Sequence, residues 1–308
     1  MKQSDDFEIY RQSPPRPVTL WRLLGGLAIA LGCWLGASVL FVIVGSVVSR
    51  GNLDTFSTSR VGTLAMFATF GGIWFGLWLA MRYLHREPLK NLFGAGGRLS
   101  WGDFQRGFAA VVLTSLLSEL LLYLVWPEMT RSPLGIGQWL TYLVPVALLC
   151  FVQTSSEELL FRGYLLRGLA NRFRSPWIWG LVPGLGFIAL HLTTGMNGND
   201  VLLVVFTIGA LTVALTIVVY ATGNLGAAFG MHMANNLFAF TLVSHQNDFS
   251  QFALVRGVQL EGDLSPARLI TLAAISLACI ALTLVLLLHK ASPLRLRGAN
   301  EDLRETFV

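Results

Sequence analysis

Two carboxylates and a guanidinium interrupt an apolar stretch of the sequence at SSEELLFRGY, residues 155–164. Charged side chains are costly in a nonpolar surrounding and by default mark a functional site there. If the stretch is helical, Glu158 and Arg162 lie four residues apart on one face and can pair. Glu157 lies about 100° around the helix from Glu158 and points elsewhere. Glu157 is therefore the carboxylate left free to act as a general base, unless these charges serve only to lock two helices together.

Two histidines and an asparagine lie in later apolar stretches, His191 at the end of LGFIALH and His232 within GMHMANN. Asn236 is four residues after His232 and shares its helical face, whereas Asn235 does not. Phe187 precedes His191 by one turn, where its ring can pack on the imidazole. Each polar residue alone could simply bond a neighbouring helix. Taken together with the Glu-Arg pair, they predict one shared buried site.

The chemistry open to this set of residues is hydrolytic. Glu157 can take a proton from a water that His191 orients, while His232 and Asn236 donate hydrogen bonds to an oxyanion. Glu157, His191 and His232 could instead hold Zn²⁺ with an open position for water. The residues leave both alternatives open. The sequence has no H-E-x-x-H motif and no G-x-S-x-G motif, which argues against those zinc and serine hydrolases.

The composition is that of a polytopic membrane protein, since 54% of the 308 residues are hydrophobic and 13% are charged. We therefore expect an all-α fold, a membrane helical bundle of about eight transmembrane helices. The net charge of +5 comes from basic residues in short segments between apolar runs. This distribution indicates membrane topology rather than a nucleic-acid partner. The three cysteines lie inside apolar runs without C-x-x-C spacing, so we expect them to pack rather than bind metal.

The expected spans are apolar runs of the length that crosses a bilayer as helix. A turn signal at 221–224 divides one long run into the sixth and seventh spans. The spans are Leu23–Ser49, Val61–Met81, Gly107–Trp126, Leu134 to about Phe161, Trp177–Leu192, the two parts of Val201–Asn247, and Leu269–Leu288.

Basic residues concentrate in alternate connections, which by the positive-inside rule places both termini in the cytoplasm. Short loops and the lack of a signal-peptide pattern suit a bacterial inner membrane. The expected parts of the chain are a cytoplasmic N-terminal segment (1–22), helices one to three (23–133), a core of helices four to seven (134–247), an outer loop with helix eight (248–290) and a cytoplasmic tail (291–308).

Three motifs follow one another on successive apolar segments: E-E-x-x-x-R at 157–162, F-x-x-x-H at 187–191 and H-x-x-x-N at 232–236. In type and order they resemble the motifs of the CPBP (CAAX protease and bacteriocin-processing, or ABI) intramembrane proteases. The resemblance covers roughly residues 140–240.

The resemblance implies a helical protease core with a water-filled cavity in the membrane. Carried over residue by residue, it makes Glu157 and His191 the water-activating pair and places His232 and Asn236 on the oxyanion side, with the Glu158–Arg162 pair in support. Eukaryotic members remove the last three residues of prenylated C-a-a-X proteins, and many prokaryotic members are tied to bacteriocin maturation or self-immunity. Members are often labelled metalloproteases, although a glutamate-dependent mechanism is also argued, so a zinc cofactor stays open.

These features predict an intramembrane endopeptidase whose partners are the lipid bilayer and a peptide or protein substrate, prenylated or membrane-associated. An alternative is a non-catalytic immunity or scaffold protein with the same fold. A third is a proton-coupled transporter, which the lack of inverted repeats argues against.

One expectation conflicts with straight helices, because Glu157 would lie near the cytoplasmic end of span four and His191 near the outer end of span five. We therefore expect a kink or a late helix start at Pro183-Gly184, with residues 162–174 continuing span four as an amphipathic cytoplasmic extension. Glu119, in span three, belongs to no motif. We expect it to be structural and to pair with Arg162 or another basic group.

Overall fold

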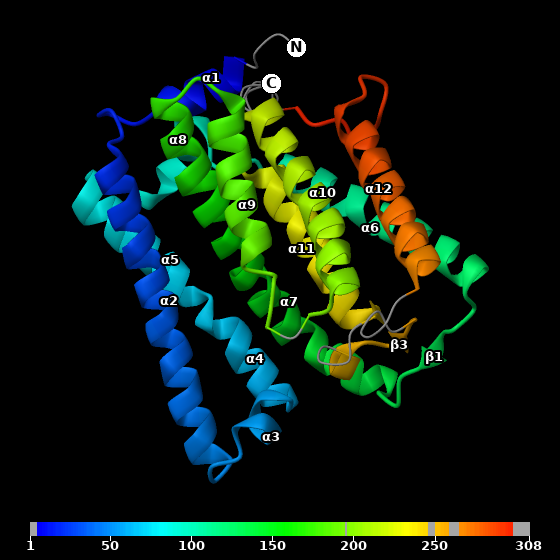
Figure 1. Cartoon of the computed structure of the whole chain (residues 1–308). Coiled ribbons are helices and arrows are strands. Elements are labelled where there is room, and N and C mark those ends of the chain that lie inside the picture. The colour runs from blue at the N-terminus through cyan, green and yellow to red at the C-terminus, as the bar shows by residue number, and fades with distance from the viewer. Residues whose placement is uncertain (1–4, 195, 246–249, 259–264, 298–308) are drawn as a thin grey trace.

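The computed structural model describes residues 5–194, 196–245, 250–258 and 265–297. Within these residues the chain is a helical bundle with three two-residue strands, which confirms the expected fold class. Helix α1 (Asp5–Gln12) lies at one end of the molecule and strands β1 and β3 lie at the other (Figure 1). Residues 298–308 of the expected tail lie outside the described residues, as do residues 1–4.

Six helical segments of the described chain are long and apolar enough to cross a membrane. Two of them combine several elements, with a π-helical stretch in each. The six are α2 (Leu20–Val48); α4 (Arg60–Thr69) with α5 (Gly71–Leu79) and η1 (Ala80–His85); α6 (Trp101–Val125); α7 (Ile136–Glu158) with η4 (Leu159–Leu166) and α8 (Arg167–Arg172); α10 (Gly198–Thr222); and α12 (Pro266–Leu288).

The other two expected spans correspond to shorter helices. The fifth consists of η5 (Trp177–Leu181) and α9 (Val182–Ala189), five and eight residues long. The seventh is α11 (Gly226–Thr241), 16 residues long, which packs against α6 and α7 and is buried over most of its surface. Because the surrounding helices enclose α11, its apolar residues pack in the protein core. Their number is therefore not set by the thickness of the bilayer.

The remaining elements connect and cap the bundle. The three strands form one small sheet in the order β1-β3-β2, with β1 antiparallel and β2 parallel to β3. The elements that connect and cap the bundle are α3 (Leu53–Ser57), η2 (Leu89–Leu92), η3 (Ala95–Gly97), η6 (Ser250–Phe252), β1 (Thr130–Arg131), β2 (Val243–Ser244) and β3 (Val255–Arg256).

Polar side chains fix where several long helices begin. Ser100, Asn197 and Ser265 each accept a hydrogen bond from a backbone N–H in the first turn of α6, α10 and α12, satisfying a donor that has no partner within the helix. Helix α10 ends at Gly223, whose φ of 58° suits a residue without a Cβ. The predicted turn at 221–224 is thus confirmed as the break between α10 and α11.

Glycines bring α6 and α11 into close contact. A Cβ added at Gly230 would collide with the Phe104 carbonyl oxygen, and one added at Gly107 would press on the Ala227 carbonyl oxygen. Small residues allow membrane helices to approach at this distance. The contact sets the position of α11 and therefore of the polar residues it carries.

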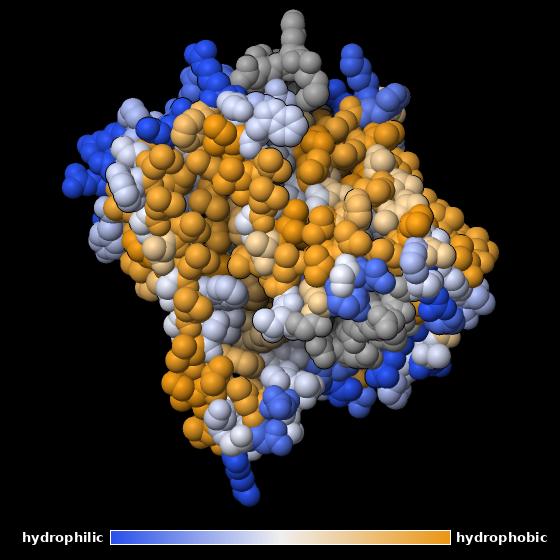
Figure 2. Space-filling view, viewed as in Figure 1, coloured by the Kyte–Doolittle hydropathy of each residue, from blue (hydrophilic) through white to orange (hydrophobic). Residues whose placement is uncertain are grey.

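The surface agrees with a membrane setting. Apolar side chains cover the middle of the molecule, and hydrophilic ones gather at the end that carries α1 and at the end that carries the strands (Figure 2). The large exposed side chains of α2 include Leu35, Leu40 and Val47, each more than half exposed. These faces are suited to contact with lipid chains.

Candidate active site

The continuous helical segment Ile136–Arg172 places Glu157 deep in the bundle. Glu157 precedes Arg172 by 15 residues and His191 follows Trp177 by 14, each about 20 Å along the chain at the rise of a helix. Because residues 173–176 join the two segments, Glu157 and His191 lie at similar depth. The helix therefore continues past Phe161, and its expected continuation toward Arg174 is confirmed as far as Arg172.

Pro183 lies in the first turn of α9, directly after the π-helical stretch η5. It therefore marks the late start of a regular α-helix, one of the two alternatives expected at this position. The irregular turns lie on either side of the connection, in η5 and in η4. Stretch η4 starts directly after Glu158, and π-helical turns are frequent at functional sites.

The predicted pair of Glu158 and Arg162 forms as expected. Arg162 Nη1 donates to Glu158 Oε1 over 2.9 Å, and both side chains are at most 2% exposed. Arg162 Nη2 donates to the carbonyl oxygen of Thr212 in α10, and the guanidinium lies 4.6 Å from the centre of the Phe187 ring in α9. The pair therefore ties three helices together around the site.

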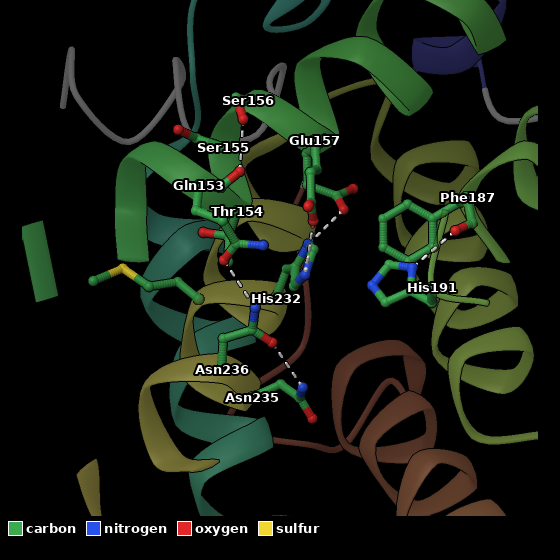
Figure 3. A network of polar contacts seen from close by, with 12 residues as sticks. Gln153, Thr154, Ser155, Ser156, Glu157, Phe187, His191, His232, Asn235 and Asn236 are labelled. Carbon is green, nitrogen blue, oxygen red and sulfur yellow. Dashed lines mark hydrogen bonds and ion pairs between the residues drawn. The ribbon is translucent and has the colours of Figure 1, made fainter. Parts of the chain in front are cut away.

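His232 lies between the two glutamates. Its Nδ1 is 2.8 Å from Glu158 Oε1, and its Nε2 is 3.5 Å from Glu157 Oε2 (Figure 3). Since the same Glu158 oxygen accepts from Arg162, Glu158 orients both Arg162 and His232. Phe187 packs edge-on against the imidazole, with ring centres 5.8 Å apart.

Glu157 has the free oxygen that general-base chemistry needs. Oε2 of Glu157 and Oε2 of Glu158 are both buried without a hydrogen-bond partner, which is costly for a carboxylate unless another group completes the site. Glu158, unlike Glu157, is held at Oε1 by Arg162 and His232. His232 and His191 both lie near Glu157, and Gln153 lies within hydrogen-bonding reach. The structure therefore brings together the glutamate and both histidines that the sequence singled out.

His191 follows the C-terminal end of α9, and one of its ring nitrogens is already committed. Nδ1 lies 2.8 Å from the Phe187 carbonyl oxygen. Since a carbonyl only accepts, Nδ1 carries the proton and Nε2 of the neutral ring keeps its lone pair. The Phe187 ring packs on the imidazole with centres 4.7 Å apart, as the four-residue spacing predicts. Figure 3 places His191 on the opposite side of Glu157 from Gln153.

Asn236 is held by a chain of amides. Asn235 Nδ2 donates to Asn236 Oδ1, and Asn236 Nδ2 donates to Gln153 Oε1, both over 3.0 Å. The Gln153 amide nitrogen is then available to donate to Glu157. Asn236 keeps one N–H for a further acceptor.

Sequence reasoning missed Gln153 and the role of Asn235. Gln153 is a polar residue in an apolar run, four residues before Glu157 and therefore on the same helical face. This spacing could have identified it. Asn235 was set aside because it is off the face of His232, but it reaches its neighbour Asn236 along the helix surface. No sequence signal pointed to Thr212, whose backbone carbonyl makes the contact.

The zinc alternative receives no support from the arrangement of side chains. Among the described residues, no group of three or more His, Cys, Asp and Glu residues could hold a metal ion. The candidate ligands Glu157, His191 and His232, which all lie in the described part of the chain, do not form such a group.

Glu119 lies apart from this site and pairs with His245 rather than with Arg162. His245 Nε2 is 3.0 and 3.1 Å from the two Glu119 oxygens, and Nδ1 is 2.8 Å from the Val258 carbonyl oxygen. Burial lowers the pKa of His245, but the hydrogen bond and charge of Glu119 outweigh burial and raise it above its usual value. The pair joins α6 to the loop that follows α11.

Comparison with known proteins places the same segment in a family. Residues 138–238 match the family model described as type II CAAX prenyl endopeptidase Rce1-like, and this segment contains all three motifs. The curated protein YyaK of Bacillus subtilis (strain 168), described as uncharacterized, is 24% identical over 256 residues, which is 78% of this chain and 85% of YyaK. No solved structure matches the chain significantly. The similarity to this family supports a protease-type enzyme in a membrane setting, and it is residues 138–238 of this chain that resemble the Rce1-like family.

Proposed function

We propose that this protein is an intramembrane endopeptidase that hydrolyses peptide bonds with water activated by Glu157. The observation that carries the proposal is the buried Oε2 of Glu157, which has no hydrogen-bond partner and lies 3.5 Å from His232 Nε2, with His191 close by. A carboxylate in this position can accept a hydrogen bond from water and then its proton.

In the proposed reaction, a water binds between Glu157 and the free Nε2 of His191. Glu157 takes one proton as the water oxygen attacks the peptide carbonyl carbon, so the C=O π bond becomes an oxyanion. When the C–N bond breaks, the same proton passes from Glu157 to the departing amine. No covalent bond between enzyme and substrate is needed.

His232 and Asn236 stabilise the oxyanion in this proposal. Asn236 has one N–H beyond its bond to Gln153. His232 donates from Nε2 only while both ring nitrogens carry protons, because Nδ1 already donates to Glu158. Preorganised donors of this kind typically contribute about 3–4 kcal/mol each.

The family points to prenylated proteins ending in C-a-a-X as substrates, and to cleavage on the cytoplasmic side of the membrane. A bacterial inner membrane, with both termini in the cytoplasm, remains our proposal for the location. The prenyl group of such a substrate would approach the site through the lipid, and its peptide would approach from the cytoplasmic water.

The test uses protein purified in detergent and two synthetic peptides with the same C-a-a-X sequence, one prenylated and one not. Mass spectrometry of the products should show loss of the last three residues from the prenylated peptide. The variant His191→Ala should show no such loss. A parallel reaction with a chelator tells whether Glu157 alone or a bound metal activates the water. Folded parent protein that cleaves neither peptide would favour the non-catalytic immunity or scaffold protein.

A further inference from the structure

A groove of about 710 Å³ runs along the outside of the bundle between α9 and α10. Trp177 and Leu185 line it on the side of η5 and α9, and Val213 lines it on the side of α10. These three side chains are more than half exposed. The apolar face of α9 and α10 turns outward in Figure 2, so the groove opens toward lipid rather than toward the protein core.

The length of the groove matches one leaflet of a bilayer. Gly209 and Tyr220 of α10 both line it, and the 11 residues between these positions span about 16 Å of helix. The hydrocarbon of one leaflet is about 15 Å deep. A single extended hydrocarbon chain therefore fits along it.

The mouth of the groove is basic and aromatic. Arg11 and Arg174 line the end that carries α1, together with Trp179 and Tyr220. Arg11 is bound to Glu8, whereas Arg174 is exposed. The hydrogen bond and charge of Arg11, aided by the charge of Arg174, hold the pKa of Glu8 below its usual value. Arg11, Arg174 and Glu8 together carry one net positive charge, among the aromatic residues that favour the membrane interface.

The inner part of the groove adjoins the active site. Thr212 lines it, and the Thr212 hydroxyl is buried and has no partner. The carbonyl of the same residue accepts a hydrogen bond from Arg162. Across the groove, Gly184 lies so close that an added Cβ would be 3.0 Å from the Thr212 side chain. What fills the groove therefore touches both α9, which positions His191, and the residue that holds Arg162.

We propose that this groove binds one acyl chain of an anionic phospholipid, with the phosphate at Arg174 and the chain between α9 and α10. The excess positive charge selects an anionic headgroup over a zwitterionic one, because each basic residue near such a surface adds attraction. The bound chain packs along the short helix α9 and supports the position of His191. The binding is independent of whether the protein cleaves peptides.

Native mass spectrometry of the full chain in detergent tests the proposal, with phosphatidylglycerol and phosphatidylcholine of equal chain length as probes. Phosphatidylglycerol should bind as one tightly held copy, several-fold more tightly than phosphatidylcholine. Arg174→Gln should weaken it about fivefold, the effect of one basic residue, and Arg82→Gln, at an exposed arginine outside the groove, should not. Val213→Trp should remove the bound copy, whereas Leu202→Trp, on an exposed part of α10 outside the groove, should keep it.

Three results would overturn the proposal. The first is equal affinity of the parent protein for the two lipids. The second is equal binding of phosphatidylglycerol by Arg174→Gln and Arg82→Gln, or by Val213→Trp and Leu202→Trp. The third is displacement of phosphatidylglycerol by an uncharged isoprenoid alcohol that binds parent and Arg174→Gln equally well, which would assign the groove to a prenyl chain. Thermal unfolding of each variant verifies that it is folded.

Discussion

At the scale of residues, the site depends on two neighbouring carboxylates, one held by short hydrogen bonds and one held more loosely. Glu158 accepts from both Arg162 and His232, so its position is fixed. Glu157, the preceding residue, has the longer 3.5 Å contact with His232 Nε2, and its Oε2 has no hydrogen bond in the same buried space. Two adjacent glutamates thus differ because the helix turns them toward different neighbours.

The Glu158–Arg162 pair should be needed for stability. Arg162→Leu leaves the Glu158 carboxylate buried with one partner fewer, and removal of one member of a buried pair typically costs about 3–5 kcal/mol. Thermal unfolding in detergent measures the loss. Arg268→Leu is the control, because the Arg268–Glu128 pair is 38% and 56% exposed, and exposed pairs contribute about 1 kcal/mol or less. Similar losses in both variants would contradict this account.

At the scale of elements, the site requires α7 with η4, α9 and α11 to hold their positions. The close contact between α6 and α11 is the most restrictive of their packing contacts, because backbone atoms of α6 occupy the space beside Gly230. His232 and Asn236 follow Gly230 on the same helix.

Gly230→Ala should therefore push α11 away from α6 and lower both stability and peptide cleavage. Unfolding temperature and cleavage rate measure the two effects. The control is Gly137→Ala in α7, where an added Cβ meets nothing within 4 Å and replacement of a helical glycine gains about 0.5–1 kcal/mol. If Gly230→Ala matched its control, the packing argument would fail.

The contact between Glu119 and His245 should make stability depend on pH. Because the folded pKa of His245 is raised, its contribution is complete below the unfolded pKa of about 6.5 and is lost as pH rises through the higher folded value. The unfolding temperature of His245→Gln should therefore fall further below that of the parent at acidic than at alkaline pH. His289→Gln, an exposed histidine, should show no such trend, and a pH-independent difference for His245→Gln would refute the assignment.

The periodicity of the sequence predicted which polar residues share a site, but not the depth of that site. The end of span four was placed near Phe161 because Arg162 and Arg167 are charged. In the structure Glu158 pairs with Arg162 and Glu87 pairs with Arg167, all buried, so the helix continues past both. Hydropathy likewise predicted full-length spans where α9 and α11 are short. A helix that is enclosed by other helices is apolar whatever its length.

At the scale of the whole molecule, the two ends differ in charge and structure. One end carries α1 and the mouth of the groove, and the other carries the small sheet (Figure 1). The positive-inside rule assigns the end with α1 to the cytoplasm.

Cysteine labelling tests this orientation in a background without the three native cysteines. A thiol reagent that cannot cross the membrane should label Thr55→Cys, at an exposed position of α3, in intact cells with a permeable outer envelope. It should label Lys290→Cys, exposed after the end of α12, once the cells are opened. The reverse pattern would place the termini outside.

The central claim is that Glu157 activates the water, and the most direct measurement is the cleavage rate of Glu157→Gln reconstituted in lipid vesicles with a prenylated C-a-a-X peptide. Glutamine keeps the size of the side chain but cannot accept the proton, so we predict a loss of at least about 100-fold with an unfolding temperature close to that of the parent. Glu128→Gln, at an exposed glutamate outside the site, should cleave at the parent rate. Cleavage by Glu157→Gln at the rate of Glu128→Gln would contradict the account.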